Sequence, residues 1–296
     1  MTDMALTIRK QFGEGDKIRD EGLATPAGIL RFDDIAYDTK DPVYNLLDVY
    51  RPKTGKGKLP VILSIHGGAW VYGDKDVYQW YCMSLAERGF AVVNYSYRLA
   101  PEHKYPSSFE DTVKVCEWMI ANADEYGLDM DNVFGVGDSA GAHMLSLFAA
   151  ALTNPDYAKT CGYRLPKDFA FKAIALNCGA FKIAKSKTPD LTTMLMGAYL
   201  PEGGTEKEFD MISAAGHITE NYPPVYLMTC PGDFLKDQPA HVISVLEEKN
   251  VQFIYHRFGD RTNELGHVFH CNIRLPEATV CNDEECAFFK EFIDRK

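Results

Sequence analysis

Long hydrophobic runs are missing from this sequence. No stretch approaches about eighteen uninterrupted apolar residues, and residues 1–20 contain no apolar core of the kind that a secretory signal needs. Gly/Ser linkers, low-complexity segments and internal repeats are missing as well. The sequence therefore predicts neither export nor membrane spanning, and we expect one cytoplasmic domain over residues 1–296.

Clusters of positive charge are also missing. The sequence has 31 Lys and Arg against 42 Asp and Glu, for a formal net charge of -11. The basic residues form no run that would neutralise a row of phosphates. We therefore do not expect nucleic acid as a partner. The oligomeric state is not encoded in any pattern, and a homodimer is left open.

Short-spaced cysteine pairs are absent, although the sequence has eight cysteines. None forms a CxxC pair, the closest spacing is Cys281 to Cys286, and most lie inside apolar stretches. A structural zinc site is the alternative, but it needs short-spaced ligand pairs. We expect buried, reduced thiols and no metal.

Strand-like and helix-like segments alternate from about residue 30 onward. Two extended stretches, 28–38 and 44–52, predict a leading β-hairpin. Six short β-branched or apolar runs follow, separated by helix-length segments: residues 60–66, 90–97, 132–137, 171–178, 223–230 and 251–258. Parallel strands need such crossover helices, so the sequence predicts an α/β protein with a mostly parallel sheet of about eight strands. Residues 1–28 and 180–220 are expected to be less regular additions.

The segment Gly137-Asp138-Ser139-Ala140-Gly141 lies between a predicted strand and a predicted helix. A serine hydroxyl is a weak nucleophile, so a catalytic serine must be exposed, held beside a base and placed near groups that receive an oxyanion. The GxSxG pattern at a strand-to-helix turn meets these needs, because the glycines relieve the crowding of such a turn. The pattern predicts Ser139 as a nucleophile.

A polar, glycine-rich turn follows the most apolar predicted strand, at Ile65-His66-Gly67-Gly68-Ala69-Trp70. Small residues allow backbone N–H groups to approach a substrate oxygen. We expect the N–H groups of Gly68, Ala69 and Ala140 to form an oxyanion hole. An ordinary glycine pair between a strand and a loop is the alternative interpretation.

An acid and a base follow Ser139 in the order that serine hydrolases of this kind use. Asp233 comes just after a predicted strand, where the catalytic groups of open α/β sheets collect. His267 lies in the polar loop after the next strand. We expect His267 to move the proton of Ser139 and Asp233 to orient the imidazole ring.

Other residues compete for these two roles. His270 is the alternative base, but it is placed to begin the next segment. Asp237 and Glu264 are the alternative acids. Asp237 is expected to start a helix, and Glu264 lies close to His267 in sequence. His256, inside a predicted strand, is expected to be structural.

Five ordered motifs resemble those of the hormone-sensitive-lipase-like esterase family: HGGAW at 66–70, YRLAPEHKYP at 97–106, GDSAGA at 137–142, PGDFLKD at 231–237 and GHVFH at 266–270. The resemblance covers roughly residues 45–295. It implies the α/β-hydrolase fold, with helices on both faces of the sheet. It also implies hydrolysis of small carboxylic esters without cofactor or metal, with Ser139, Asp233 and His267 as the catalytic residues.

Two residues depart from the family pattern. Ala69 stands where most relatives have a third glycine. The N–H of Gly67 is therefore an alternative to that of Gly68 or Ala69 as a donor to the oxyanion. Val268 follows the predicted base where many relatives have glycine. In the second motif, Arg98 and Glu102 are expected to form a structural pair behind the oxyanion loop.

By analogy with the family, residues 1–28 and 180–220 are the expected source of a small cap over the site. Apolar side chains in the cap and near the oxyanion loop are candidates to line a tight pocket: Trp70, Tyr72, Trp80, Met194, Met196 and Tyr199. Packing of the cap on the core is an alternative role for them. The aromatic crowding predicts short acyl groups, acetyl to butyryl, and acetylated sugars are among the candidate substrates.

Two other functions remain open. A peptidase or amidase on the same fold would use the same three residues, since they also cleave amides. A non-catalytic ligand receptor on this scaffold would have lost the base. The presence of His267 argues against the receptor.

Overall fold

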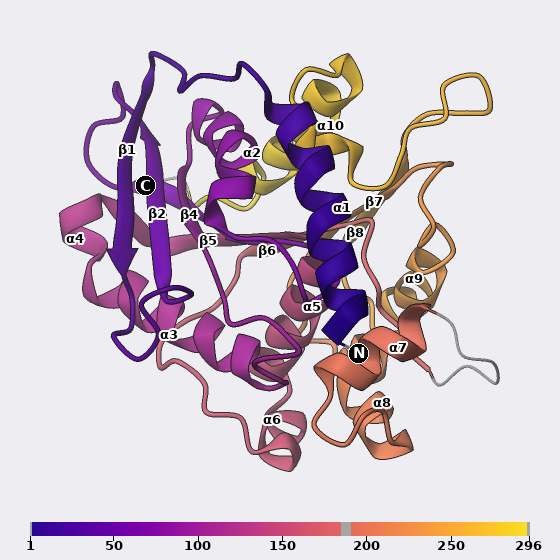
Figure 1. Ribbon diagram of the computed structural model, residues 1–296. Helices are drawn as coiled ribbons and strands as arrows, with labels where there is room; N and C mark the ends of the chain where they lie inside the picture. Colours follow the sequence, from indigo (N-terminus) through magenta and orange to yellow (C-terminus); the bar gives the residue numbers. More distant parts are fainter. Residues whose placement is uncertain (1, 185–190, 295–296) are drawn as a thin grey trace.

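An eight-stranded sheet forms the centre of this computed structural model, which describes residues 2–184 and 191–294 (Figure 1). The strands are β1 (Ile29–Ala36), β2 (Leu46–Pro52), β3 (Leu59–Ile65), β4 (Ala91–Tyr95), β5 (Leu128–Asp138), β6 (Ala173–Asn177), β7 (Val225–Thr229) and β8 (Phe253–Arg257). Their order in the sheet is β1-β2-β4-β3-β5-β6-β7-β8. β1 and β2 pair antiparallel, as do β2 and β4, and all pairs from β4 to β8 are parallel. The predicted hairpin and mostly parallel sheet are confirmed.

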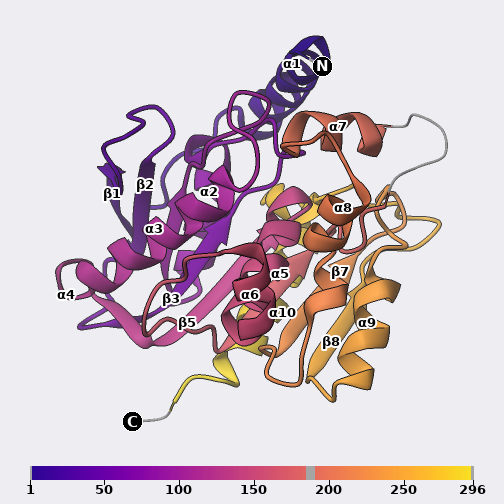
Figure 2. The same ribbon diagram turned by 90° about the horizontal axis from the view of Figure 1, so that it is seen from below.

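Helices cover both faces of the sheet (Figures 1 and 2). One face carries α2 (Lys75–Glu87) and α10 (Pro276–Lys290), and the other carries α3 (Ser107–Ala121), α5 (Ala140–Thr153) and α9 (Pro239–Glu248). Successive side chains of a strand point to opposite faces, so Ile62 of β3 belongs to the α2 side and Leu63 to the α5 side. The parallel strands read as continuous apolar runs because both of their faces are buried.

Besides the short helices α4 (Ala123–Tyr126), α6 (Pro155–Cys161) and η2 (Phe269–Cys271), two further helical segments lie outside these three layers. They are α1 (Thr2–Asp20) and the segment formed by α7 (Leu191–Tyr199), α8 (Glu206–Ile212) and the short helix η1 (Ala214–His217). The amino-terminal end of α1 lies beside α7 in both views (Figures 1 and 2). The expectation that 1–28 and 180–220 are irregular is wrong where the structure describes them, because both are largely helical. Residues 185–190 lie outside the described residues.

Local sequence explains where α8 begins. Thr205 is its N-cap: the Thr205 hydroxyl accepts from the Glu208 N–H at 3.3 Å, and the Glu208 carboxylate accepts from the Thr205 N–H at 2.8 Å. This reciprocal capping satisfies two backbone donors that the first turn of a helix leaves unpaired. No described helix is long and apolar enough to cross a lipid bilayer. All eight cysteines are free, and each is buried except the half-buried Cys161.

Candidate active site

The predicted functional residues all follow the carboxyl ends of parallel strands, at one end of the sheet. Gly68 follows β3, Ser139 follows β5, Asp233 follows β7 and His267 follows β8, and these strands are parallel. The ends of neighbouring strands are also in register, since Ile65 pairs with Gly137. The carboxyl ends of parallel strands are where ligands of open α/β sheets bind.

Ser139 occupies a strained turn between β5 and α5. Its backbone has φ 51° and ψ -117°, which is unfavourable for a residue with a Cβ. The Ser139 N–H donates to the carbonyl of Asn177 at 2.9 Å, and its carbonyl accepts the first bond of α5. A Cβ at Gly141 would lie 2.0 Å from the carbonyl oxygen of Ile65, so only glycine allows α5 to approach β3 this closely. The turn leaves Ser139 partly exposed while Asp138 and Ala140 are buried.

His267 and Asp233 are hydrogen-bonded. His267 Nδ1 lies 2.6 Å from Oδ1 of Asp233, which also accepts from the Leu235 N–H at 2.8 Å. The other oxygen, Oδ2, accepts from the Thr229 hydroxyl at 2.6 Å. Burial raises the pKa of Asp233, but the hydrogen bond and charge of His267 and the hydrogen bonds from Thr229 and Leu235 together outweigh it, so the pKa is below its usual value. An ionised Asp233 holds the proton on Nδ1 and leaves Nε2 as the acceptor.

The competing candidates lie elsewhere. His270 is fully buried, its ring packs on Tyr81 at 5.0 Å, and burial lowers its pKa to about 3. Asp237 and Glu264 are exposed. His256 is on β8, where its Nδ1 lies 2.7 Å from Glu284.

The loop after β3 has an unusual backbone. Gly68 has φ +116°, and a Cβ there would lie 2.1 Å from the carbonyl oxygen of Tyr72. Ala69 and Trp70 also have positive φ, 53° and 61°. The N–H of Gly67 donates to the hydroxyl of Tyr78 at 3.0 Å. Among residues 2–184 and 191–294, no hydrogen-bond acceptor is bound to the N–H of Gly68 or to that of Ala69. These two N–H groups are therefore free to donate to a substrate.

Strained backbone conformations are concentrated near the carboxyl ends of the strands. Eight described residues other than glycine have positive φ, and five of them follow the carboxyl ends of strands: Ala69, Trp70, Ser139, Cys178 and Val268. Val268 is the most unusual, because a β-branched residue rarely adopts φ 53°. Such strain persists only where the surrounding structure enforces it, and it is typical of functional sites.

Trp70 and Tyr199, two predicted pocket residues, pack on each other. Their rings stack at 5.4 Å, so Tyr199 of α7 covers the loop after β3. Trp70 Nε1 donates to Nδ1 of His143 at 3.2 Å, and His143 Nε2 lies 2.8 Å from the carbonyl of Ile212 at the end of α8. Burial lowers the pKa of His143 to about 4, so the ring is neutral and donates from Nε2. These contacts tie α7 and α8 to the loop.

The remaining pocket candidates have different surroundings. The Tyr72 hydroxyl donates to the Asp16 carboxylate of α1 at 2.7 Å. On α7, Met194 is 46% exposed and Met196 is buried. Trp80 is partly buried on α2 and packs against the cluster on the α2 side of the sheet.

Two residues near the base were missed by sequence reasoning. The ring of Phe234 lies 4.2 Å from the ring of His267 and is 68% exposed. The Cys178 thiol is buried, and its sulfur lies within 4.8 Å of ligand atoms of Asp233 and His267. Phe234 directly follows the predicted acid, which is a signal that was available. Cys178 carried no signal beyond its place after a predicted strand.

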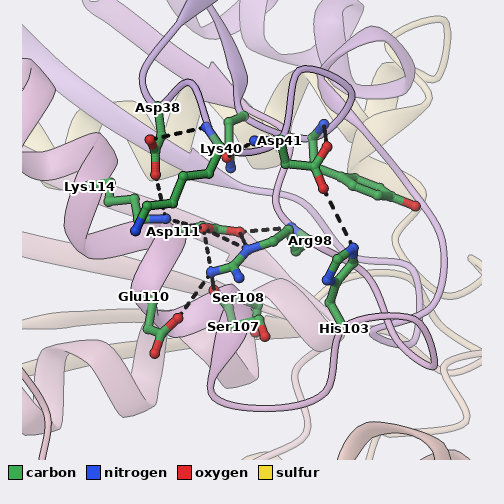
Figure 3. Close-up of polar contacts among 12 residues, drawn as sticks. Asp38, Lys40, Asp41, Arg98, His103, Ser107, Ser108, Glu110, Asp111 and Lys114 are labelled. Atoms are coloured by element: carbon green, nitrogen blue, oxygen red, sulfur yellow. Dashed lines mark hydrogen bonds and ion pairs between the residues drawn. The ribbon is translucent and has the colours of Figure 1, made fainter.

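The expected pairing of Arg98 with Glu102 is wrong (Figure 3). The Arg98 guanidinium binds the buried carboxylate of Asp111 at 2.9 Å and the carboxylate of Glu110 at 3.0 Å. Glu102 instead pairs with Arg9 of α1 at 2.6 Å. Helix α3 brings Asp111 against the backbone of Arg98, whose N–H also donates to it at 3.0 Å. The second motif therefore fastens α1 and α3 to the loop after β4.

Two groups of potential metal ligands occur among the described residues: Cys178, Asp233 and His267, and Asp138, His270 and Cys271. Each offers a carboxylate, an imidazole and a thiol within 4.8 Å of one another. In the first group the facing atoms of Asp233 and His267 are already joined by their short hydrogen bond. This arrangement favours proton transfer over metal coordination.

Comparisons with known proteins find similarity to esterases. A model of the BD-FAE family matches residues 47–236, a range that includes Ser139 and Asp233 and ends before His267. The versiconal hemiacetal acetate esterase of Dothistroma septosporum is 28% identical over an alignment of 248 positions, which covers 78% of this chain and 73% of that protein. Several other curated relatives match over less than two thirds of their length, down to 29%.

Solved esterases have the same fold. The crystal structure of esterase B from Lactobacillus rhamnosis has a TM-score of 0.89 with 24% identity, over 99% of this chain and 95% of that chain. The same enzyme inhibited by a C4-C4 tributyrin phosphonate gives a TM-score of 0.89 and 25% identity over the same shares of the two chains.

A sheet of this topology with a serine at such a turn defines the α/β-hydrolase class of serine hydrolases. Within that class, the chain belongs to the BD-FAE family of hormone-sensitive-lipase-like esterases, since the family model matches more than half of it. It is a serine carboxylic-ester hydrolase.

Proposed function

We propose that this enzyme cleaves short-chain carboxylic esters, acetyl to butyryl, through an acyl-enzyme on Ser139, with His267 as the base and Asp233 as its partner. The 2.6 Å hydrogen bond between His267 and Asp233 carries the proposal, because a base must be oriented by a third group to activate a serine. The strained, partly exposed turn at Ser139 supports the role of nucleophile.

Each catalytic step has a named group. His267 Nε2 takes the proton of Ser139 as its Oγ attacks the ester carbonyl, and Asp233 stabilises the imidazolium that forms. The N–H groups of Gly68, Ala69 and Ala140 receive the oxyanion. His267 then returns the proton to the leaving alcohol, and a water molecule activated by the same ring hydrolyses the acyl-enzyme. The bond from Gly67 to Tyr78 favours Gly68 and Ala69 over Gly67 as donors.

Short acyl groups are supported by two observations. Trp70, beside the candidate oxyanion donors, is covered by Tyr199, which leaves little room for a long chain. The names of the relatives also refer to short acyl esters, an acetate for the Dothistroma enzyme and tributyrin for the inhibitor of esterase B. Acetylated sugars are small acetyl esters and belong to the same proposed class.

A cap formed by α1 and by α7 to η1 is part of this proposal. Both segments contact residues just after β3: Arg9 of α1 donates to the carbonyl of Val71 at 2.8 Å, and Tyr199 stacks on Trp70. The buried Ala5 and Ile8 attach α1 to the core. We place the acyl pocket beneath these helices, and the enzyme in the cytoplasm, where free thiols persist.

The serine variant Ser139→Ala tests the proposed nucleophile. With p-nitrophenyl acetate and butyrate, we expect turnover to fall on the order of 10³-fold or more, because the residual rate comes only from binding and the oxyanion donors. Ser244→Ala, at an exposed serine of α9, is the matched control and should keep full activity. Unchanged turnover in Ser139→Ala would refute the mechanism.

A further inference from the structure

The Tyr78 hydroxyl joins the two loops that would meet at the reacting carbonyl. It accepts from the N–H of Gly67 at 3.0 Å and donates to Oδ2 of Asp138 at 2.8 Å. Gly67 directly precedes Gly68, the first candidate oxyanion donor, and Asp138 directly precedes Ser139. One hydroxyl group on α2 therefore bridges the donor loop and the nucleophile turn.

This bridge is buried. Tyr78 is 8% exposed, Asp138 is 2% exposed, and Gly67 is buried. A Cβ on Gly67 would lie 2.4 Å from Oδ2 of Asp138 and 2.9 Å from the Tyr78 hydroxyl oxygen, so the three groups are in direct contact. Hydrogen bonds in such a site are stronger than in water, and they resist relative movement of the segments that they join.

Asp138 is costly to bury. Burial raises its pKa to about 6, although the Tyr78 hydroxyl, the positive charge of His267 and the Gly67 N–H oppose the rise. At neutral pH the carboxylate is therefore ionised and accepts a charge-assisted hydrogen bond from Tyr78. A buried carboxylate next to the nucleophile stabilises the fold poorly, which favours a role in the site instead.

The donor loop needs such support. Tyr97 fixes the residue before Gly67: its hydroxyl donates to the His66 carbonyl at 2.9 Å, and the rings of Tyr97 and His66 stack at 4.0 Å. Beyond Gly67 the loop continues through Ala69 and Trp70 in a strained conformation. An oxyanion hole works only when its donors lie about 2.7–3.1 Å from the developing oxyanion. Small displacements of Gly67 would be passed directly to Gly68 and Ala69.

We propose that Tyr78 and Asp138 are positioning residues that fix the separation between the oxyanion donors and Ser139. This inference rests on the proposed function of Ser139, Gly68 and Ala69. It assigns to Asp138 a task other than proton transfer, and to Tyr78 a task other than packing of α2 on the sheet.

The variant Tyr78→Phe removes only the hydroxyl group. We expect kcat for p-nitrophenyl acetate, corrected for the concentration of active sites, to fall about tenfold with KM changed by less than about twofold, because the loss affects the transition state and not substrate binding. The rate of inactivation by a butyl phosphonate should fall by a similar factor, since its adduct carries an oxyanion in the same place.

Tyr50→Phe is the matched control. The Tyr50 hydroxyl also donates to a buried carboxylate, Asp48 Oδ2 at 2.6 Å, but on β2, in the antiparallel part of the sheet. It should lower the melting temperature as Tyr78→Phe does and leave kcat unchanged. A kcat for Tyr78→Phe equal to that of the control would overturn the inference.

A second pair of variants keeps the test decisive if Tyr78→Phe does not fold. Asp138→Asn retains an acceptor for Tyr78, whereas Asp138→Ala does not, so kcat should fall more in Asp138→Ala. Equal values of kcat in the two would contradict the positioning role. The parent proposal is judged separately: if Ser139→Ala keeps its turnover, the proposed function itself fails, whatever Tyr78→Phe does.

Discussion

His267 Nδ1 lies 2.6 Å from Asp233 Oδ1, although the two residues are 34 positions apart and follow different strands. The turns that carry them are also joined by a parallel bridge between Gly232 and Gly266. The Thr229 hydroxyl and the Leu235 N–H hold the carboxylate from other directions. The imidazole is thus oriented by a group that is itself fixed.

Asp233→Asn tests this orientation. The amide keeps the shape of the side chain, but it can donate to Nδ1, which would place the ring proton on Nε2, where the serine proton must go. We expect kcat to fall on the order of 10³- to 10⁴-fold with little change in KM. The measurement is steady-state hydrolysis of p-nitrophenyl butyrate. Asp237→Asn, at an exposed residue of the same segment, is the control, and equal activity of the two variants would contradict the role of Asp233.

Histidine variants distinguish the two candidate bases. His267→Gln should lose activity on the order of 10³-fold or more, because no other group would accept the serine proton. His270→Gln should lower the melting temperature and retain kcat per active site, since His270 is fully buried against Tyr81. Thermal unfolding of each variant separates loss of folded enzyme from loss of turnover. The reverse pattern would assign the base to His270.

Acyl-chain length tests the pocket. We expect kcat/KM to decrease from p-nitrophenyl acetate and butyrate to octanoate. In Tyr199→Ala, the space over Trp70 opens, and the octanoate-to-acetate ratio should rise roughly tenfold, the effect of a few added methylene contacts. Tyr226→Ala, a buried residue on the α2 side of the sheet, should leave the ratio unchanged. A wild-type profile that rises with chain length would contradict the proposed substrate class.

The pH dependence of stability tests the buried Glu285. Its carboxylate accepts from Asn177 at 2.6 Å and from Tyr81 at 3.0 Å, and burial raises its pKa from 4.5 to about 7. Between these values the folded state binds the proton more tightly than the unfolded state, so Glu285 makes the free energy of unfolding fall as the pH rises.

Glu285→Gln removes this titration. We measure the free energy of unfolding of variant and wild type by urea denaturation at several pH values. The difference between them, variant minus wild type, should rise by on the order of 3 kcal/mol from about pH 4.5 to pH 8. Glu284→Gln, on a half-exposed neighbour of the same helix, is the control. A difference between Glu285→Gln and wild type that does not vary with pH would contradict the assignment.

Much of this architecture can be predicted from the sequence, because its signals are local. Each parallel strand is a short apolar run followed by a polar turn, and the order of Ser139, Asp233 and His267 along the chain places them at the ends of three such strands. His267 is distinguished from His270 by its place within the polar loop. These inferences need only the period of a strand and the rule that parallel strands end at the same edge.

Interactions between distant segments are not predictable in this way. The partner of Arg98 depends on where α3 lies, and the nearby Glu102 was the wrong choice because α1 supplies Arg9 for it. Helix α1 was itself missed, since its sequence is largely polar and much of its surface is exposed. The bond from Tyr78 to Gly67 required the packing of α2 on the sheet.

Helix α1 also constrains the order of events during synthesis. Arg274 donates to the carbonyls of Arg19 and Glu21, which close the carboxyl end of α1, across 255 and 253 positions of the chain. The partners of Arg9, Val71 and Glu102, are therefore synthesised long before Arg274, so the amino-terminal half of α1 can dock before its carboxyl end does. The carboxyl end of α1 gains its contacts with Arg274 only after β8 has been made, so these contacts form when all eight strands of the sheet are available.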